Sequence, residues 1–145
     1  MHQPTGQWRY WFYYIEVLTG TQTITKKFPL EEFPLYIKEG AIIPLKIQRA
    51  YTGIGDSTSA KYLTWLIYPK GKSEFTVYDP KDQTPTTLSV DQQKNVISLN
   101  FKGRKLPSIF RIHTSARPEK VMLDGVVQEF QYDSQKQKVV LTMKP

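Results

Sequence analysis

Pairs of carboxylate side chains stand close together at two places in the sequence, where they could support acid–base chemistry. Glu31 and Glu32 are adjacent, and Asp79 and Asp82 flank a Pro-Lys dipeptide. Hydrolysis of a glycosidic bond with retention needs two carboxyl groups about 5–5.5 Å apart, one as nucleophile and one as acid. Glu31 and Glu32 point to opposite sides of an extended segment, and Asp79 and Asp82 suit a turn, where Asp accepts backbone hydrogen bonds. We therefore expect turn and surface carboxylates here, and no catalytic residue.

Metal and cofactor sites are not indicated by the sequence. The chain has no Cys, and its two His residues, His2 and His113, lie far apart. Zinc requires three or four nitrogen, sulfur or oxygen ligands, and no such set is apparent. The sequence also contains no phosphate-binding loop, no dinucleotide fingerprint and no serine-hydrolase elbow. We expect no metal and no cofactor, and His113 is expected to be an ordinary side chain at the end of a strand.

Large aromatic residues are the remaining candidates for ligand contact: Trp8, Tyr10, Trp11 and Trp65. They could stack on the apolar faces of sugars, or they could pack in a core or against a neighbouring domain, as large aromatics in strands generally do. The run at residues 8–15 is apolar on both faces of a strand, because side chains alternate with a period of two. Since one sandwich covers one face, we expect an exposed aromatic patch in the isolated chain.

The charge and hydropathy of the chain argue against a nucleic-acid partner and against a membrane span. Net charge is +7, from 20 Lys and Arg against 13 Asp and Glu, but only five of the 20 are Arg and the Lys residues are scattered. Phosphate-binding surfaces favour clustered Arg, so we expect no nucleic-acid partner. No apolar run approaches the roughly 20 residues of a membrane span, and the first ten residues do not resemble a signal peptide. An exported (periplasmic or surface) and a cytoplasmic location both stay open.

Short alternating segments separated by turns predict an all-β fold. Apolar and polar residues alternate in five segments of the second half: 95–101, 108–113, 120–124, 127–132 and 138–143. Asp124-Gly125 predicts a two-residue hairpin, because a type I′ turn needs positive φ at both central residues. Residues 62–68 are almost continuously apolar and precede a Pro-Lys-Gly turn. We place a domain boundary at that turn, which gives segments 1–68 and 69–145.

The segment from Phe28 to Leu45, FPLEEFPLYIKEGAIIPL, reads as two short strands around a turn at Gly40. Its Pro, Gly and apolar positions, together with Gly6-Gln7-Trp8 and the aromatic run after it, resemble the region that follows the catalytic barrel in glycoside hydrolase family 31. This family contains the retaining α-glucosidases and α-xylosidases. The phrase at residues 74–79 (EFTVYD) and the segment 107–127 are similar to later strands of the same family, although the turn after Asp79 lacks the family's Gly and paired acids.

The resemblance implies two small antiparallel β-sandwich modules in tandem, a proximal one at residues 1–68 and a distal one at 69–145. It also implies a parent enzyme whose (β/α)8 barrel is the partner of this chain and carries an Asp nucleophile. The nucleophile motif of the family does not occur here. We therefore expect a non-catalytic fragment that braces the barrel, and the alternative is a carbohydrate-binding module with an exposed Trp/Tyr face.

Overall fold

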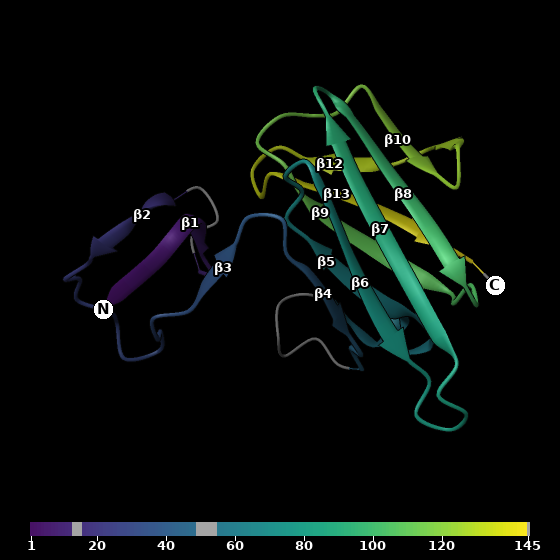
Figure 1. Ribbon diagram of the computed structural model, residues 1–145, viewed down its shortest axis with the longest axis horizontal. Helices are drawn as coiled ribbons and strands as arrows, with labels where there is room; N and C mark the ends of the chain where they lie inside the picture. The colour runs from purple at the N-terminus through teal and green to yellow at the C-terminus, as the bar shows by residue number, and fades with distance from the viewer. Residues whose placement is uncertain (13–15, 49–54, 145) are drawn as a thin grey trace. The chain divides into compact units, whose positions relative to one another are not determined.

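The computed structural model describes residues 1–12, 16–48 and 55–144, and these residues form strands almost throughout (Figure 1). The chain divides into two compact units, Met1–Glu39 and Gly40–Pro145. Thirteen strands and one short 3-10 helix are assigned within the described ranges. The all-β class predicted from the alternation of apolar and polar residues is confirmed.

The first unit, Met1–Glu39, contains one three-stranded antiparallel sheet. Its order is β2-β1-β3, with β1 in the centre. A bulge lies between Gln3 and Gly6, and Gly6 has a φ of +136°, a conformation that residues with a side chain rarely adopt. The strands are β1 (His2–Tyr10), β2 (Val17–Thr23) and β3 (Tyr36–Lys38).

One face of the second unit is a five-stranded sheet with the order β12-β13-β9-β5-β4. All neighbours in it run antiparallel except β5 and β9, which are parallel. A 3-10 helix, η2 (Ser57–Lys61), precedes β5. The strands are β4 (Ile42–Leu45), β5 (Leu63–Ile67), β9 (Ser108–His113), β12 (Gln131–Asp133) and β13 (Lys138–Met143).

The other face of the second unit is a five-stranded sheet with the order β11-β10-β8-β7-β6. Here β8 and β10 are parallel, and the other neighbours are antiparallel. The β10–β11 connection confirms the predicted hairpin, since Asp124 and Gly125 have φ of +50° and +79°. The strands are β6 (Lys72–Tyr78), β7 (Pro85–Gln93), β8 (Val96–Gly103), β10 (Lys120–Leu123) and β11 (Val126–Gln128).

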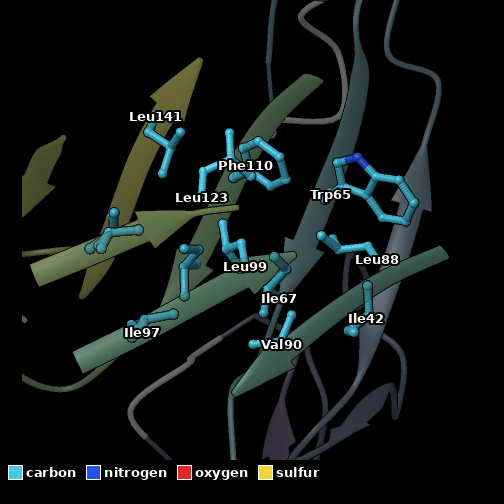
Figure 2. Packing of buried hydrophobic residues seen from close by; sticks show 13 residues of the cluster. Ile42, Trp65, Ile67, Leu88, Val90, Ile97, Leu99, Phe110, Leu123 and Leu141 are labelled. Atoms are coloured by element: carbon cyan, nitrogen blue, oxygen red, sulfur yellow. The ribbon is translucent and has the colours of Figure 1, made fainter. Parts of the chain in front are cut away.

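The hydrophobic core of the second unit lies between its two sheets, with strands of one sheet crossing over strands of the other (Figures 1 and 2). Trp65, Ile67 and Phe110 from one sheet pack with Leu88 and Leu99 from the other, and all five are fully enclosed. Strand alternation sends every second residue of each sheet inward. Each such side chain contributes about 1.5–3 kcal/mol when it is removed from water, so this core holds the sandwich together.

The boundary expected at residues 68–69 differs from the observed division at Glu39–Gly40. Strand β5 pairs with β9 from Leu63↔Ser108 to Ile67↔Ile112, so a cut after residue 68 would separate two neighbours of one sheet. The sequence signals of a turn and a composition change are local, whereas this pairing joins residues 45 positions apart. The expected strands around Gly40 are present, but β3 and β4 belong to sheets of different units.

Candidate functional site

The Glu31–Glu32 pair does not form a convergent acidic site. Glu31 lies in a turn and is exposed. The carboxylate of Glu32 accepts a hydrogen bond from the Tyr10 hydroxyl at 2.5 Å, so it serves to anchor that ring. The expectation that these two carboxylates act separately agrees with this arrangement.

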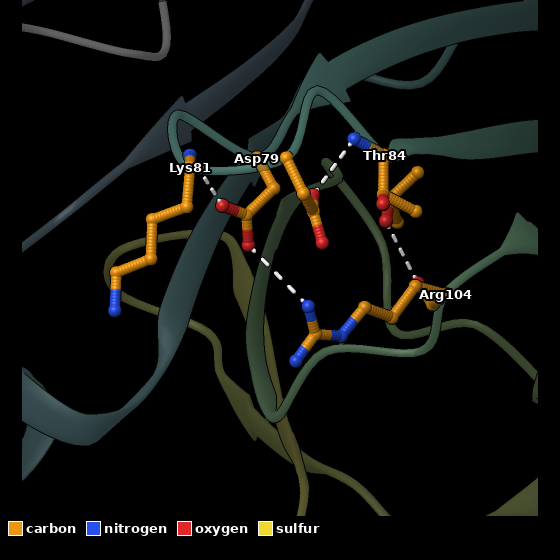
Figure 3. A network of polar contacts seen from close by, with 6 residues as sticks. Asp79, Lys81, Thr84 and Arg104 are labelled. Atoms are coloured by element: carbon orange, nitrogen blue, oxygen red, sulfur yellow. Dashed lines mark hydrogen bonds and ion pairs between the residues drawn. The ribbon is translucent and has the colours of Figure 1, made fainter.

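Asp79 and Asp82 stabilise the turn between β6 and β7, and Figure 3 shows Asp79 in this turn with Lys81 and Thr84. Asp79 Oδ1 accepts the backbone N–H of Lys81 at 2.8 Å, and Asp82 Oδ1 accepts that of Thr84 at 2.9 Å. The backbone N–H and the hydroxyl of Thr84 lower the pKa of Asp82, because both hydrogen bonds favour the ionised form. The prediction that these residues act as turn carboxylates is confirmed. No group of three or more His, Cys, Asp or Glu within the described ranges is arranged to hold a metal ion.

His113 ends β9, as expected, and its side chain is buried. Its ring stacks on Tyr68 with 4.6 Å between centroids and 6° between planes. The pair is part of the packing of the second unit.

Trp65, one of the four candidate sugar-stacking residues, lies in the centre of the core. Its ring is fully buried, and Nε1 donates a hydrogen bond to Ser108 Oγ at 3.1 Å. It also packs against Phe101, with 6.2 Å between ring centroids. Neither face of the indole is open to a ligand, so Trp65 has the core-packing role that was the alternative to sugar stacking.

Tyr10 is likewise fully buried, at the centre of an aromatic cluster in the first unit. The rings of Phe12, Phe28 and Tyr36 lie 5.2–5.8 Å from it, centroid to centroid. The ammonium group of Lys26 lies 4.4 Å from the Tyr10 ring centroid. Tyr10 therefore organises this unit and does not offer a free face for a sugar.

Trp8 and Trp11 are half-buried. Trp8 Nε1 donates a hydrogen bond to the carbonyl oxygen of Pro4 at 3.0 Å. The backbone N–H of Trp11 donates one to the carbonyl oxygen of Leu35 at 2.9 Å. The strand expected to continue through residue 15 ends at Tyr10, and residues 11–12 form a bend. The part of the predicted aromatic patch at residues 13–15 lies outside the described residues.

A hollow of about 170 Å³ that the sequence did not indicate lies at one end of the sandwich, beside the β6–β7 turn. We call it the Tyr78 hollow, after the exposed ring at the end of β6. Arg104 comes from the segment after β8, and its Nη1 donates to Asp79 Oδ2 at 3.4 Å (Figure 3). No local motif joins residues 79 and 104, so sequence reasoning had no signal for this pair. The lining consists of Leu63, Val77, Tyr78, Asp79, Pro80, Thr84, Thr86, Arg104 and Leu106.

Comparison with known proteins gives relatives that are much longer than this chain. No protein-family model matches it. An isomaltosyltransferase from Sporosarcina globispora is 27% identical over 136 residues, which cover 88% of this chain and 12% of the relative. The cycloalternan-forming enzyme from Listeria monocytogenes, solved in complex with a pentasaccharide substrate, matches 99% of this chain and 15% of its own, with 22% identity and a TM-score of 0.75. The chain has the fold of a segment of this enzyme.

A dextranase of glycoside hydrolase family 31 from Flavobacterium johnsoniae, complexed with glucose, shares the same fold. It matches 99% of this chain and 22% of its own, with 18% identity and a TM-score of 0.75. The resemblance read from the sequence is thus confirmed in three dimensions: the fold recurs within a family 31 enzyme. Across these relatives the chain spans only 12–22% of their length. Within the described ranges of the chain, no helix has the length and apolar character of a membrane span.

Proposed function

We propose that this chain is a non-catalytic C-terminal β-sandwich region of a glycoside hydrolase family 31 enzyme, where it braces the (β/α)8 catalytic barrel. One observation carries the proposal: the fold matches over 99% of this chain but over only 15–22% of much larger carbohydrate-active enzymes. This small share supports an accessory role for the segment within the whole enzyme. The parent would be a retaining α-glycosidase, with its reacting carboxyl groups about 5–5.5 Å apart in the barrel.

The roles of the carboxylates in this chain support a non-catalytic assignment. Asp79 and Asp82 bind backbone N–H groups of their own turn, and Glu32 binds the Tyr10 hydroxyl. A general acid and a nucleophile must instead face a shared space across the scissile bond. We infer that the chemistry resides in the barrel and that this region supplies packing surface.

Exposed apolar side chains on both units supply surface for such packing. Leu30 and Phe33 are exposed in the first unit, and Val126 and Val127 are exposed on the edge strand β11 of the second. A strand at the edge of a sheet has unpaired backbone groups that another chain or domain can pair with. The edge strand β11, whose residues Val126 and Val127 are both exposed, is the part of the chain for which we expect a covering partner.

The substrate class follows only from the relatives and is part of the proposal. Their names refer to isomaltosyl transfer, to cycloalternan formation and to dextran cleavage. We therefore propose an α-glucosyl saccharide as the substrate of the parent enzyme, with an α-xyloside as the alternative that the family resemblance leaves open.

Deletion from the whole enzyme tests the bracing role. The coding sequence directly upstream is expected to encode the (β/α)8 barrel, and the enzyme with and without these 145 residues is compared by thermal unfolding and by hydrolysis of p-nitrophenyl α-glucoside. We expect deletion to lower the Tm of the barrel, and the separate chain to hydrolyse the substrate no faster than buffer. Turnover by the separate chain, or an unchanged Tm after deletion, would contradict the proposal.

Carbohydrate binding is the second candidate function. Two of the four aromatic rings first considered for it are enclosed, but the exposed Tyr78 ring beside a hollow is a specific observation in its favour. The site that this observation suggests differs from the Trp/Tyr face expected from the sequence.

A further inference from the structure

The Tyr78 hollow combines an exposed aromatic ring with apolar and polar lining in a small concave space. Tyr78 is 62% exposed although it ends a strand of the sandwich, where it pairs with Pro85. Leu63, Val77 and Leu106 contribute apolar atoms to the lining. A ring with an apolar body and a hydroxyl tip at the edge of such a space is the kind of group that binding surfaces use.

Two charged side chains, Asp79 and Arg104, line the hollow together with Tyr78. Asp79 follows Tyr78 in the chain, and its carboxylate accepts a hydrogen bond from Arg104. The Arg104 side chain is 55% exposed, so several of its five N–H donors face solvent. Asp79 Oδ1 already accepts the N–H of Lys81, which holds the carboxylate in place. The pair therefore offers both a donor fork and an acceptor to a ligand in the hollow.

The backbone keeps this arrangement in place before any ligand arrives. Gly103, which precedes Arg104, has a φ of +91°, and a Cβ built there would come within 2.4 Å of the Pro85 carbonyl oxygen. The Thr86 hydroxyl donates to the carbonyl of Arg104 at 2.8 Å. The close approach of residues 103–104 to residues 85–86 thus depends on a glycine at position 103. A preformed site avoids the cost of ordering loops when a ligand binds.

The charge of the lining favours an uncharged ligand. It contains one acid, Asp79, and one base, Arg104, and they already pair with each other. An anionic ligand at Arg104 would be repelled by the Asp79 carboxylate that pairs with it, whereas hydroxyl groups can donate to the carboxylate and accept from the guanidinium at once. A hollow of about 300 Å³ shares Leu63 and Leu106 with this one and gives room for a longer ligand.

We propose that the Tyr78 hollow binds one unit of a neutral oligosaccharide. The apolar face of the sugar stacks on the Tyr78 ring, and its hydroxyl groups bond to Asp79 and Arg104. The geometry of the site does not depend on the proposed function, but the choice of α-glucans as first probes rests on that function.

Titration of the intact chain with oligosaccharides tests the site. The probes are isomaltotriose, maltotriose and a xyloglucan oligosaccharide, followed by 15N-resolved NMR shifts and by calorimetry. We expect saturable shifts for at least one of them, centred on residues 78–86 and 103–106. Removing the ring in Tyr78→Ala and the fork in Arg104→Ala should each weaken binding about three- to tenfold, since aromatic and charge-assisted contacts are of that size.

Matched variants on nearby residues separate a site from a general effect on folding. Phe75→Ala removes another aromatic ring of β6, which is 42% exposed. Lys105→Ala removes a cation that is 61% exposed and pairs with Asp124, not with Asp79. Neither residue lines the hollow, so affinity should stay within about twofold of the parent chain, a change of under 0.5 kcal/mol. Thermal unfolding checks that each variant is folded.

Four outcomes would overturn the proposal: no saturable shift with any saccharide, equal loss of binding in the control variants, binding that survives Tyr78→Ala in a folded protein, or preferential binding of heparin or DNA at the same residues. The last would mean that the site selects anions. The bracing role is read out separately, by the Tm of the parent enzyme after deletion. A chain that stabilises its barrel but binds no sugar would therefore contradict only this inference.

Discussion

The two units of the chain differ in how they remove apolar surface from water. In Gly40–Pro145 two five-stranded sheets face each other, and side chains from both enclose a shared core. In Met1–Glu39 there is one three-stranded sheet, and among its described residues only Gln3 and Tyr10 are buried. A single small sheet has no opposing sheet to cover its apolar face, so its order depends on a few large rings.

Aromatic residues take the place of a second sheet in the first unit. Phe12, Phe28 and Tyr36 surround Tyr10, and Phe33 meets Phe12 edge-on with 5.7 Å between ring centroids. Each such ring pair adds about 0.5–1.5 kcal/mol beyond the burial of its area. The comparison indicates that the stabilising contacts of the second unit are spread over many core residues, whereas those of the first unit are concentrated around Tyr10.

The largest expected effect is on the core of the second unit. Phe110→Ala should lower the free energy of unfolding by about 3–5 kcal/mol, because it leaves a cavity among residues of both sheets. Chemical denaturation measures the loss, and hydrogen exchange locates it. We expect amide protection to fall in residues 40–144 much more than in residues 1–39.

The control for this change is Val127→Ala, at a residue that is 59% exposed. Its free energy of unfolding should stay within about 0.5 kcal/mol of the parent chain. Equal loss of protection in both units after Phe110→Ala would break the comparison, because the chain would then unfold as one cooperative body.

A smaller and local effect is expected in the first unit. Tyr10→Phe keeps the ring but removes the hydroxyl that donates to Glu32. It should cost about 1.5–3 kcal/mol, the net value of a hydrogen bond to a charged group. Hydrogen exchange in β1, β2 and β3 measures the change. Tyr78→Phe, at a residue that is 62% exposed, is the matched control and should leave these amides unchanged. If the two variants behaved alike, Tyr10 could not be the centre of the first unit.

Local signals in the sequence were sufficient where the structure is local. The Asp124-Gly125 turn, the alternation at residues 108–113 and 138–143, and the buried strand at 63–67 all follow from neighbouring residues. These patterns reflect turn chemistry and a period of two, which act within a few positions. They fix the class of fold and most strand positions.

Features that depend on pairing between distant residues could not be predicted from local sequence patterns. The segment 127–132 was predicted as one strand, but it divides into β11 and β12, which belong to opposite sheets. An alternating segment looks the same in either sheet, so periodicity could not indicate the change. The domain boundary and the meeting of Arg104 with Asp79 were missed for the same reason. Residue type alone also could not show that two of the four candidate rings, Tyr10 and Trp65, are buried while Tyr78 is exposed.

The smallest expected effect is a pH dependence at the β10–β11 hairpin of the second unit. Burial alone would raise the pKa of Asp124, but hydrogen bonds from Lys105 and from the backbone N–H of Phe101 outweigh it. The folded pKa therefore lies below the ordinary value of 3.8. A carboxylate with a depressed pKa stabilises the fold above its unfolded pKa, and this contribution is lost as pH falls through the folded value.

Urea unfolding of the parent chain and of Asp124→Asn between pH 7 and pH 2.5 isolates this contribution. The amide can still accept the Phe101 N–H but cannot pair with Lys105, which approaches Asp124 Oδ2 to 2.5 Å. We expect the variant to be less stable at pH 7 by roughly 0.5 kcal/mol, because the pair is partly exposed, and the difference to shrink as pH falls from 4 toward 2.5. A difference that stayed constant from pH 7 to pH 2.5 would mean that Asp124 acts through turn geometry and not through its charge.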